Sequence, residues 1–339
     1  MDADIIIVGA GPAGLCLAKR LSGRSLKITV LEQQSRDQLE APQFDGREIA
    51  LTQHSAKLMQ EMGLWDLIPG ADIAPLVDAR VIDGPSSFSM VIGHELGGRS
   101  ELGWLVSNHL IRQAAWLGVQ QAMAANADIT LLTDEIVTAV HTEATQGSVT
   151  LASGKTLTAK LVVAADSRFS TTRRMMGIAA HMHDFGKNML VCAMTFEKPH
   201  GFAAWEWFGY GQTLALLPMN PHPVTGAHRA SAVITLPSRE IEALMQMEPD
   251  AFNAAVTQRF ANRLGAMHLV STRHNYPLVA VFPQRLVAQR FATVGDAAVG
   301  MHPVTAHGFN FGLLSVDALT KEIATALHTQ GDIGSTSLL

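Results

Sequence analysis

The segment from residue 4 to residue 32 restricts the fold of this chain more than any other. An apolar, β-branched run leads into the glycine-rich turn Gly9-Ala10-Gly11-Pro12-Ala13-Gly14, and apolar residues at helical spacing follow it. A second apolar run, residues 26–31, ends at Glu32. This order of strand, glycine turn, helix, strand and acid is typical of a dinucleotide-binding βαβ unit, and it predicts an α/β fold with a doubly wound sheet.

Each glycine of the turn has a separate physical task in such a unit. Gly9 permits the tight turn, Gly11 lets the backbone approach a pyrophosphate, and Gly14 lets the helix pack closely on the strand. Ala13 lies between them in the first helical turn, where unpaired N–H groups carry partial positive charge toward the phosphates. Glu32 lies roughly 20 residues further on, the distance expected for an acid that binds the adenosine ribose. This segment alone does not distinguish FAD from NAD.

Two later strand ends favour FAD. The apolar run 157–165 ends at Asp166, and the run 291–294 ends at Gly295-Asp296. Carboxylates at the carboxyl edge of the sheet can accept hydrogen bonds from the ribityl hydroxyls, which NAD lacks. N–H groups of Gly308, Phe309 and Asn310, at a predicted helix start, can stabilise negative charge on the flavin. The alternative is that both aspartates only cap helices.

Composition excludes several classes of protein. The chain has 339 residues, 47% hydrophobic and 16% charged, which predicts roughly two globular domains. A net charge of −5 shows no electrostatic footprint for nucleic acid. No apolar run is long enough for a transmembrane helix, and the acidic N-terminus argues against a signal peptide. Cys16 and Cys192 are expected to be reduced core residues, so we predict a cytoplasmic protein. His181-Met182-His183-Asp184 lacks further ligands at zinc spacing, so we expect a solvated loop and no metal site.

Five separated motifs carry a resemblance to a known family. They are GAGPAG (9–14), FDGREIALT (44–52), LVSNHLIR (105–112), ADSRFS (165–170) and, across residues 295–310, GDAA…HP…HGFN. Over the whole chain they resemble the para-hydroxybenzoate-hydroxylase-like flavin monooxygenases. Within these, the chain is most similar to the UbiH/UbiF/UbiM-type hydroxylases of ubiquinone synthesis, with the UbiM subgroup nearest.

The resemblance implies FAD-dependent hydroxylation of an aromatic ring of demethoxyubiquinol or polyprenyl-phenol type. In this family O2 and reduced flavin give a C4a-hydroperoxide that attacks an electron-rich ring, and NAD(P)H or another reductant supplies the electrons. The implied partners are an isoprenoid quinol or phenol substrate and proteins of a quinone-biosynthesis complex. Peripheral contact with the inner membrane is also implied, and nucleic acid is not.

The resemblance also implies further site residues. Arg47 is expected to meet the FAD pyrophosphate with both arms of its guanidinium, with a surface salt bridge as the alternative. Arg112 and Asn108 are placed at the same cofactor. Pro303 and His307 are assigned to the catalytic loop beside the flavin, where a histidine could change protonation when the flavin is reduced.

Three positions depart from the family pattern. Ser167 follows Asp166 where Gly is usual, Val299 stands where His is usual, and His307 stands where Gln is usual. The family also continues for some tens of residues beyond Leu339, so a C-terminally shortened form lacking the last helical part is expected. Two alternatives stay open: a flavin dehydrogenase or reductase of isoprenoid substrates, and a non-catalytic FAD subunit of a quinone-synthesis complex.

The chain is predicted to form a discontinuous Rossmann-like FAD-binding domain with an inserted mixed β-sheet substrate domain. We assign residues 1–72, 97–182 and 275–339 to the first, and 73–96 and 183–274 to the second. A helix capped by Ser107 is predicted over 108–125, and a three-stranded meander over 134–164. Trp205-Glu206-Trp207 begins like a signature of flavin halogenases, but Phe208-Gly209 breaks it, so we expect alternate aromatics on a strand.

Overall fold

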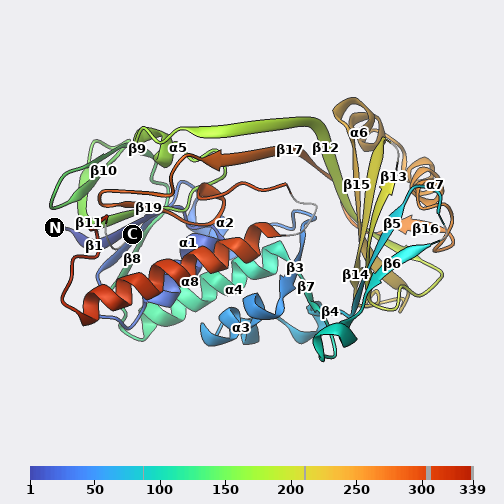
Figure 1. Cartoon of the computed structure of the whole chain (residues 1–339), viewed down its shortest axis with the longest axis horizontal. Helices are drawn as coiled ribbons and strands as arrows, with labels where there is room; N and C mark the ends of the chain where they lie inside the picture. The colour runs from blue at the N-terminus through green and yellow to red at the C-terminus, as the bar shows by residue number, and fades with distance from the viewer. Residues whose placement is uncertain (87, 210, 303–306, 337–339) are drawn as a thin grey trace.

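The computed structural model describes residues 1–86, 88–209, 211–302 and 307–336. Two lobes lie side by side and are joined along one side by two long strands (Figure 1). We call them the Rossmann lobe, which contains both labelled chain ends, and the sheet lobe. The predicted fold class, an α/β Rossmann-like domain with an inserted mixed sheet, is confirmed.

The sheet of the Rossmann lobe has eight strands, with the central order β18-β19-β11-β1-β2-β8. Its strands are β1 (Ala3–Val8), β2 (Ile28–Leu31), β8 (Ile129–Leu132), β9 (Val137–Thr142), β10 (Gly147–Leu151), β11 (Thr156–Ala164), β18 (Val287–Ala288) and β19 (Phe291–Thr293). Strands β19, β11, β1, β2 and β8 pair in parallel, so their carboxyl ends meet at one edge. Apolar side chains bury both faces of these strands, as parallel sheets require.

Most helices of this lobe cover one face of the parallel strands, and the antiparallel strands β9 and β10, with the short helix at 171–175, cover the other. The helices of the lobe are α1 (Pro12–Leu21), α2 (Arg36–Glu40), α3 (Gln53–Glu61), α4 (Asn108–Ala124), α5 (Thr171–Met175) and α8 (His307–His328). Helix α1 packs between α4 and α8, and the three share one core that includes Leu17, Trp116 and Ile323 (Figure 1). Strands β9 and β10 enclose a second core around Val149. Cys16 and Cys192 are buried free thiols, as expected.

The sheet lobe is a mixed sheet with the order β16-β12-β15-β14-β13-β5-β6, and β17 also pairs with β12. Its elements are β5 (Asp78–Asp83), β6 (Ser89–Ile92), β12 (Ala180–Phe196), β13 (Ala203–Gly209), β14 (Gln212–Met219), β15 (His228–Pro237), α6 (Ser238–Met245), α7 (Pro249–Arg259), β16 (Met267–Leu269) and β17 (His274–Pro283). Alternate side chains such as Trp205, Leu216 and Ile234 pack with Phe252 in one core on the helix side of the sheet. We call the opposite side of the sheet its inner face.

The strands β12 and β17 run across both lobes (Figure 1). They pair from Ala180–Pro283 to Val191–His274, with a bulge between Asp184 and Asn188. The domain boundary proposed at 182/183 therefore lies inside β12. The expectation of a loop at 181–184 was wrong: these residues are exposed but paired with β17, and exposure of both faces removed the alternation that marks a strand.

A small sheet of β3 (Glu48–Thr52), β7 (Gly103–Ser107) and β4 (Ala74–Leu76) lies on the side of the Rossmann lobe that faces the sheet lobe. Helix α4 begins at the predicted position, directly after Ser107. Ser107 is the N-cap residue, as predicted, but its side chain makes no capping hydrogen bond. The Ser107 hydroxyl donates to Glu48 Oε1 at 2.6 Å across the β3–β7 pair, because it lies directly opposite Glu48 in the register.

Candidate cofactor and substrate site

The glycine turn between β1 and α1 has the geometry of a phosphate-binding turn. Gly9 has φ +109°, and a Cβ there would lie 2.5 Å from the Ala165 carbonyl oxygen. A Cβ on Gly14 would lie 2.0 Å from the Gly9 carbonyl oxygen, so helix and strand can approach this closely only without it. A Cβ on Gly11, the N-cap of α1, would meet nothing within 4 Å. The helix start is therefore open to a ligand at the point where its N–H groups are unpaired.

Glu32 lies beside this turn at the end of β2. Its Oε2 accepts a hydrogen bond from Ala10 N at 2.7 Å, and its Oε1 accepts one from Gln34 N at 2.8 Å. These two bonds hold the buried carboxylate at the carboxyl edge of the sheet, and each oxygen keeps a lone pair for a second donor. Contact between Glu32 and a ribose hydroxyl stays a prediction.

Asp166 and Asp296 reach the same edge from β11 and β19. Asp166 Oδ2 accepts hydrogen bonds from Thr172 N at 3.2 Å and Thr172 Oγ1 at 3.1 Å, so this oxygen stabilises the start of α5, as the capping alternative proposed. Asp166 Oδ1 is buried, with no hydrogen-bond partner among the described residues. Asp296 is partly exposed and lies 3.6 Å from Arg168 Nη2. One oxygen of Asp166 and the carboxylate of Asp296 are thus able to bind a further donor.

The first turn of α8 lies against the same edge. A Cβ on Gly308 would lie 3.8 Å from Asp296 Oδ1, and the buried Asn310 side chain joins α8 to β3. Asn310 Nδ2 donates to the Ala50 carbonyl at 2.8 Å, while its Oδ1 accepts from Thr52 N at 3.0 Å. Phe309 packs against the core of the lobe. The Asn310 side chain therefore fixes the start of α8 against β3, a structural role that was not predicted. The predicted role of its backbone N–H at the flavin stays a prediction.

Two residues assigned to the catalytic loop are not placed by the structure. Pro303 lies outside the described residues, and His307 is described only as the first backbone position of α8. Their predicted roles stay predictions.

The predicted arginines divide between two neighbourhoods. Arg47 pairs with Asp45, whose Oδ2 lies 3.0 Å from Nε and 2.5 Å from Nη2. Asn108 Nδ2 donates to the same Asp45 oxygen at 2.8 Å. Arg112 instead donates to Gln34 Oε1 at 3.2 Å, next to the end of β2. Arg47 and Asn108 are therefore brought together through Asp45, while Arg112 binds Gln34. The predicted contacts of these three residues with FAD stay predictions.

Asp45 is the residue of this cluster that sequence reasoning missed. Burial opposes its ionisation, but the hydrogen bonds and charge of Arg47, with Asn108, hold its pKa below the usual range. Its backbone carbonyl accepts a 2.5 Å hydrogen bond from the Tyr276 hydroxyl of β17, so the cluster also ties the two lobes together. Its place in the motif 44–52 was the available signal.

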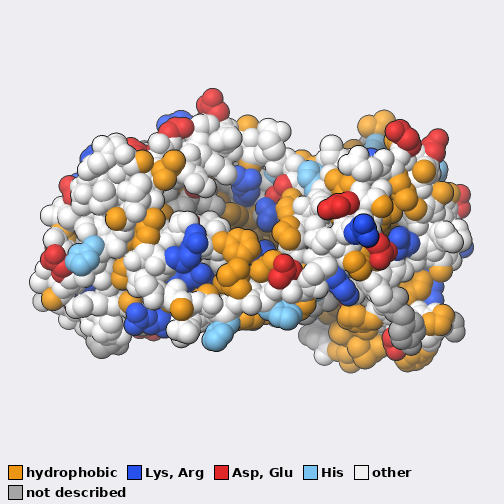
Figure 2. Space-filling view, turned by 90° about the horizontal axis from the view of Figure 1, so that it is seen from above, with side chains coloured by type: hydrophobic (Ala, Val, Ile, Leu, Met, Phe, Trp, Pro, Cys, Tyr) orange, Lys and Arg blue, Asp and Glu red, His pale blue; other side chains and the backbone are white. Residues whose placement is uncertain are grey.

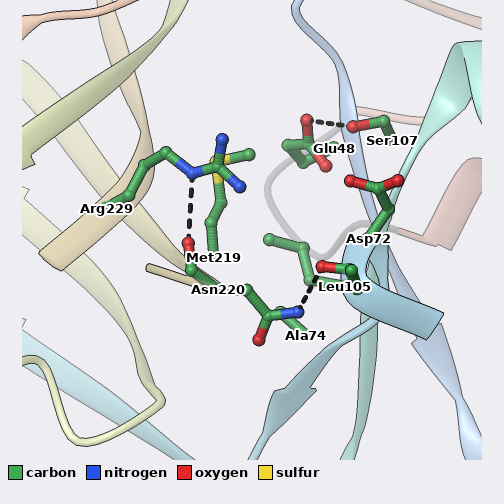
Figure 3. A pocket seen from close by; sticks show the side chains of 9 residues that line it. Glu48, Asp72, Ala74, Leu105, Ser107, Met219, Asn220 and Arg229 are labelled. Carbon is green, nitrogen blue, oxygen red and sulfur yellow. Dashed lines mark hydrogen bonds between the residues drawn. The ribbon is translucent and has the colours of Figure 1, made fainter. Parts of the chain in front are cut away.

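A polar pocket lies between the small sheet and the sheet lobe (Figure 3). The Arg229 guanidinium points across it toward Glu48 and Asp72, and Arg229 Nε donates to the Asn220 carbonyl at 3.1 Å. Burial raises the pKa of Glu48 to about 7, although the Ser107 hydrogen bond and Arg229 act in the opposite direction. This pocket was not predicted from the sequence, because its residues come from four separate parts of the chain: β3, the segment 71–74, β7 and the β14–β15 hairpin.

The residues fit an FAD molecule at the carboxyl edge. An open glycine turn, an acid at the end of β2, a buried carboxylate oxygen on Asp166 and a partly exposed carboxylate on Asp296 provide groups for pyrophosphate and hydroxyls. The surface is hollowed between the lobes, with hydrophobic and basic side chains around the hollow (Figure 2). The fold and these groups together define a flavoprotein with a two-lobed Rossmann architecture.

Comparison with known proteins supports this class and narrows it. The sequence model of the family described as "FAD binding domain" matches residues 2–336. Ubiquinone hydroxylase UbiM of Neisseria meningitidis is 45% identical, over 100% of this chain and 72% of its own length. Ubiquinone hydroxylase UbiL of Rhodospirillum rubrum is 34% identical, over 99% of this chain and 76% of its own length. The chain belongs to the FAD-binding family that contains these ubiquinone hydroxylases, and the prediction of FAD as cofactor is confirmed.

Solved structures share the fold. The crystal structure of Pseudomonas aeruginosa PqsL in complex with 2-aminobenzoylacetate has a TM-score of 0.80 at 20% identity, covering 98% of this chain and 88% of that one. The tetrameric form of 2-methyl-3-hydroxypyridine-5-carboxylic acid oxygenase has a TM-score of 0.71 at 17% identity, covering 97% and 83%.

Proposed function

We propose that this protein is an FAD-dependent monooxygenase that hydroxylates the aromatic ring of an isoprenoid quinol or phenol in ubiquinone biosynthesis. The observation that carries the proposal is the 45% identity to a ubiquinone hydroxylase over the whole chain. The open glycine turn and the carboxylates at one sheet edge support the binding of the cofactor that such a reaction needs. Bound FAD, once reduced, supplies the electrons that activate O2.

The protein supplies position, charge and exclusion of water. The α8 N-terminus carries partial positive charge, and Asn310 fixes it against β3, so this charge is held at a constant place beside the cofactor site. The inner face of the sheet lobe closes the site from the other side through Tyr276 and Arg229. An aromatic ring held between the lobes would be shielded from bulk water, which favours oxygen transfer over loss of oxidant.

The test uses the purified holoprotein. Its yellow ligand, released by heat and identified by chromatography, should be FAD, and a short-tailed demethoxyquinol with NAD(P)H and ¹⁸O2 should give a product one labelled oxygen heavier. Label-free oxidation of the substrate would instead identify a dehydrogenase. Bound FAD without turnover of any quinol or phenol, with NAD(P)H or a chemical reductant, would identify a non-catalytic subunit. To identify the electron donor, we would compare turnover with NADH, with NADPH and with the chemical reductant alone.

Peripheral membrane contact is a second proposal, and an exposed apolar patch favours it. Phe88, Met90, Val91, Ile92 and Leu96 are each 42–82% exposed along β6 and the adjacent 3-10 helix η3 (His94–Gly97). Hydrophobic side chains gather at this edge of the sheet lobe (Figure 2), and patches of this kind often mark interaction sites. No helix in the described ranges combines the length and apolar character needed to cross a bilayer. Pelleting with phosphatidylcholine vesicles should fall when Phe88 and Leu96 are both changed to Ser, and equal pelleting of both proteins would contradict the proposal.

Partner proteins of a quinone-biosynthesis complex belong to the same proposal. Co-purification with the other ubiquinone-synthesis enzymes from the native host tests it.

A further inference from the structure

The inner face of the sheet lobe carries an acidic side chain, Glu206, for which the described part of the chain provides no hydrogen-bond or ion-pair partner. It lies in the middle of β13, between Trp205 and Trp207. These two aromatic side chains belong to the core on the helix side of the sheet. Because side chains alternate along a strand, Glu206 points to the opposite, inner face.

The neighbours of Glu206 on that face are apolar. The sheet register places Ala215 of β14 on one side of it and Val81 of β5 on the other, and Val233 of β15 is the next residue in the row. None of these side chains can donate a hydrogen bond or ionise. An unpaired carboxyl among apolar side chains destabilises the folded protein when it is ionised. A bound ligand that donates a hydrogen bond to this carboxyl would remove that cost, and such carboxyls are often found at functional sites.

The inner face is the side that meets the Rossmann lobe. Four inner-face residues make this contact: the Tyr276 hydroxyl binds the Asp45 carbonyl, the His274 ring lies against Gly46, and Met219 and Arg229 line the pocket with Glu48. Glu206 therefore belongs to the surface that is turned toward the predicted flavin. The hollow between the lobes in Figure 2 lies over the same junction.

Partial burial changes the acidity of this group. Desolvation raises the pKa of Glu206 to about 7, and no charged side chain contributes to the shift. The carboxyl is thus divided between its neutral and ionised forms near neutral pH, and the ionised form is a strong hydrogen-bond acceptor.

We propose that Glu206 is a positioning residue that accepts a hydrogen bond from the hydroxyl of a phenol or quinol ring on the inner face. This inference rests on the proposed function and names the group that recognises the substrate. If the proton moves, the phenolic O–H bond breaks, an O–H bond forms on Glu206, and the electron pair stays on the phenolic oxygen. The ring becomes more electron-rich, which is the change that attack by an electrophilic oxygen requires.

The proposal predicts how the ligand hydroxyl and the side chain depend on each other. We would titrate the FAD-loaded protein with 2-prenylphenol and with its methyl ether, which lacks the donor, and follow the flavin absorbance. The native protein should bind the phenol about tenfold more tightly than the ether at about pH 8, since hydrogen bonds to charged groups have this strength. In Glu206→Gln the preference should shrink several-fold. In Glu240→Gln, an exposed acid on α6, it should stay.

The pH dependence separates positioning from mere structural support. Phenol affinity of the native protein should rise severalfold from about pH 6 to about pH 8, as the Glu206 carboxyl ionises, and affinity for the ether should not. Glu206→Gln should show a flat profile for both ligands. An equal affinity for phenol and ether in the native protein, or an unchanged slope in the variant, would overturn the proposal. The ligand comparison in the native protein stands even if the variant fails to fold.

Failure of this proposal is distinguishable from failure of the proposed function. If the native protein incorporates ¹⁸O into a quinol but shows no preference for the free phenol, the proposed function holds and the role of Glu206 is refuted. If the native protein prefers the phenol in a Glu206-dependent manner but never incorporates oxygen, the phenol-binding site holds and the hydroxylase function is refuted.

Discussion

Replacing Glu48 by Gln should stabilise the protein at neutral and alkaline pH. Glu48 is largely buried, and burial is the main cause that raises its pKa from 4.5 to about 7. A carboxyl whose pKa is raised by folding binds its proton more tightly in the native state than in the unfolded state. Its contribution is therefore favourable below about pH 4.5, and it is lost as pH rises toward 7.

The shift fixes the size of the effect. A change from 4.5 to about 7 corresponds to a cost of about 3 kcal/mol once the group is ionised, at about 1.4 kcal/mol for each pH unit. Gln keeps the size of the side chain, and its amide oxygen can still accept the Ser107 hydroxyl that lies 2.6 Å from Glu48 Oε1. The variant thus removes the ionisation and leaves the hydrogen bond.

Urea unfolding of both proteins between about pH 4.5 and pH 8.5 measures this difference. We compare the free energy of unfolding of Glu48→Gln with that of the native protein. The difference should grow by about 3 kcal/mol as the pH rises from about 4.5 through 7, and it should stay constant at higher pH. Glu206 titrates in the same range but is present in both proteins, so its contribution cancels. Arg229→Gln, which removes the cation facing Glu48, should move the transition to higher pH. A difference that does not change with pH would refute the reasoning.

Three further predictions concern the cofactor site. Gly11→Ala should leave folding intact but weaken FAD binding, while Gly14→Ala should damage folding itself, because its Cβ would lie 2.0 Å from the Gly9 oxygen. Thermal unfolding of the apoprotein and titration with FAD compare the two variants, and equal effects would contradict the separate roles given to the two glycines. Asp296→Ala should lower FAD affinity by about 5- to 150-fold, or ~1–3 kcal/mol, measured by quenching of FAD fluorescence, and an unchanged affinity would remove Asp296 from the site. His307→Gln should flatten the dependence of the flavin reduction potential on pH between about 6 and 8, because a protonated imidazole stabilises the reduced, anionic flavin; identical slopes in a potentiometric titration would leave His307 a structural residue.

The sequence predicted those parts of the site that lie next to one another along the chain. Gly9, Gly11, Gly14 and Glu32 occupy one βαβ unit, where local spacing determines geometry, and they lie together in the structure. Asp166 and Asp296 also arrive at the same edge, because parallel strands place their carboxyl ends together. These positions follow from local patterns and one topological rule.

Contacts between distant segments could not be read in the same way. The pairing of Asp45 with Asn108 and Tyr276, and that of Ser107 with Glu48, depend on how the lobes and the small sheet pack. The exposed half of β12 gave no alternating pattern, since both its faces meet solvent. In the sequence, Glu206 appears only as the residue between two tryptophans. That its neighbours on the sheet are apolar could be seen only from the register of the paired strands.

The interleaving of the two lobes has a consequence for synthesis on the ribosome. Strand β11 is complete long before its neighbour β19 emerges, and β12 must wait for β17. During that interval β11, whose second half is apolar, has one edge without hydrogen-bond partners, which is the condition under which nascent chains pair with each other. Neither sheet can close until the last quarter of the chain is available. We therefore expect yields of recombinant protein to depend on translation rate and on chaperone supply more than the stability of the finished fold would suggest.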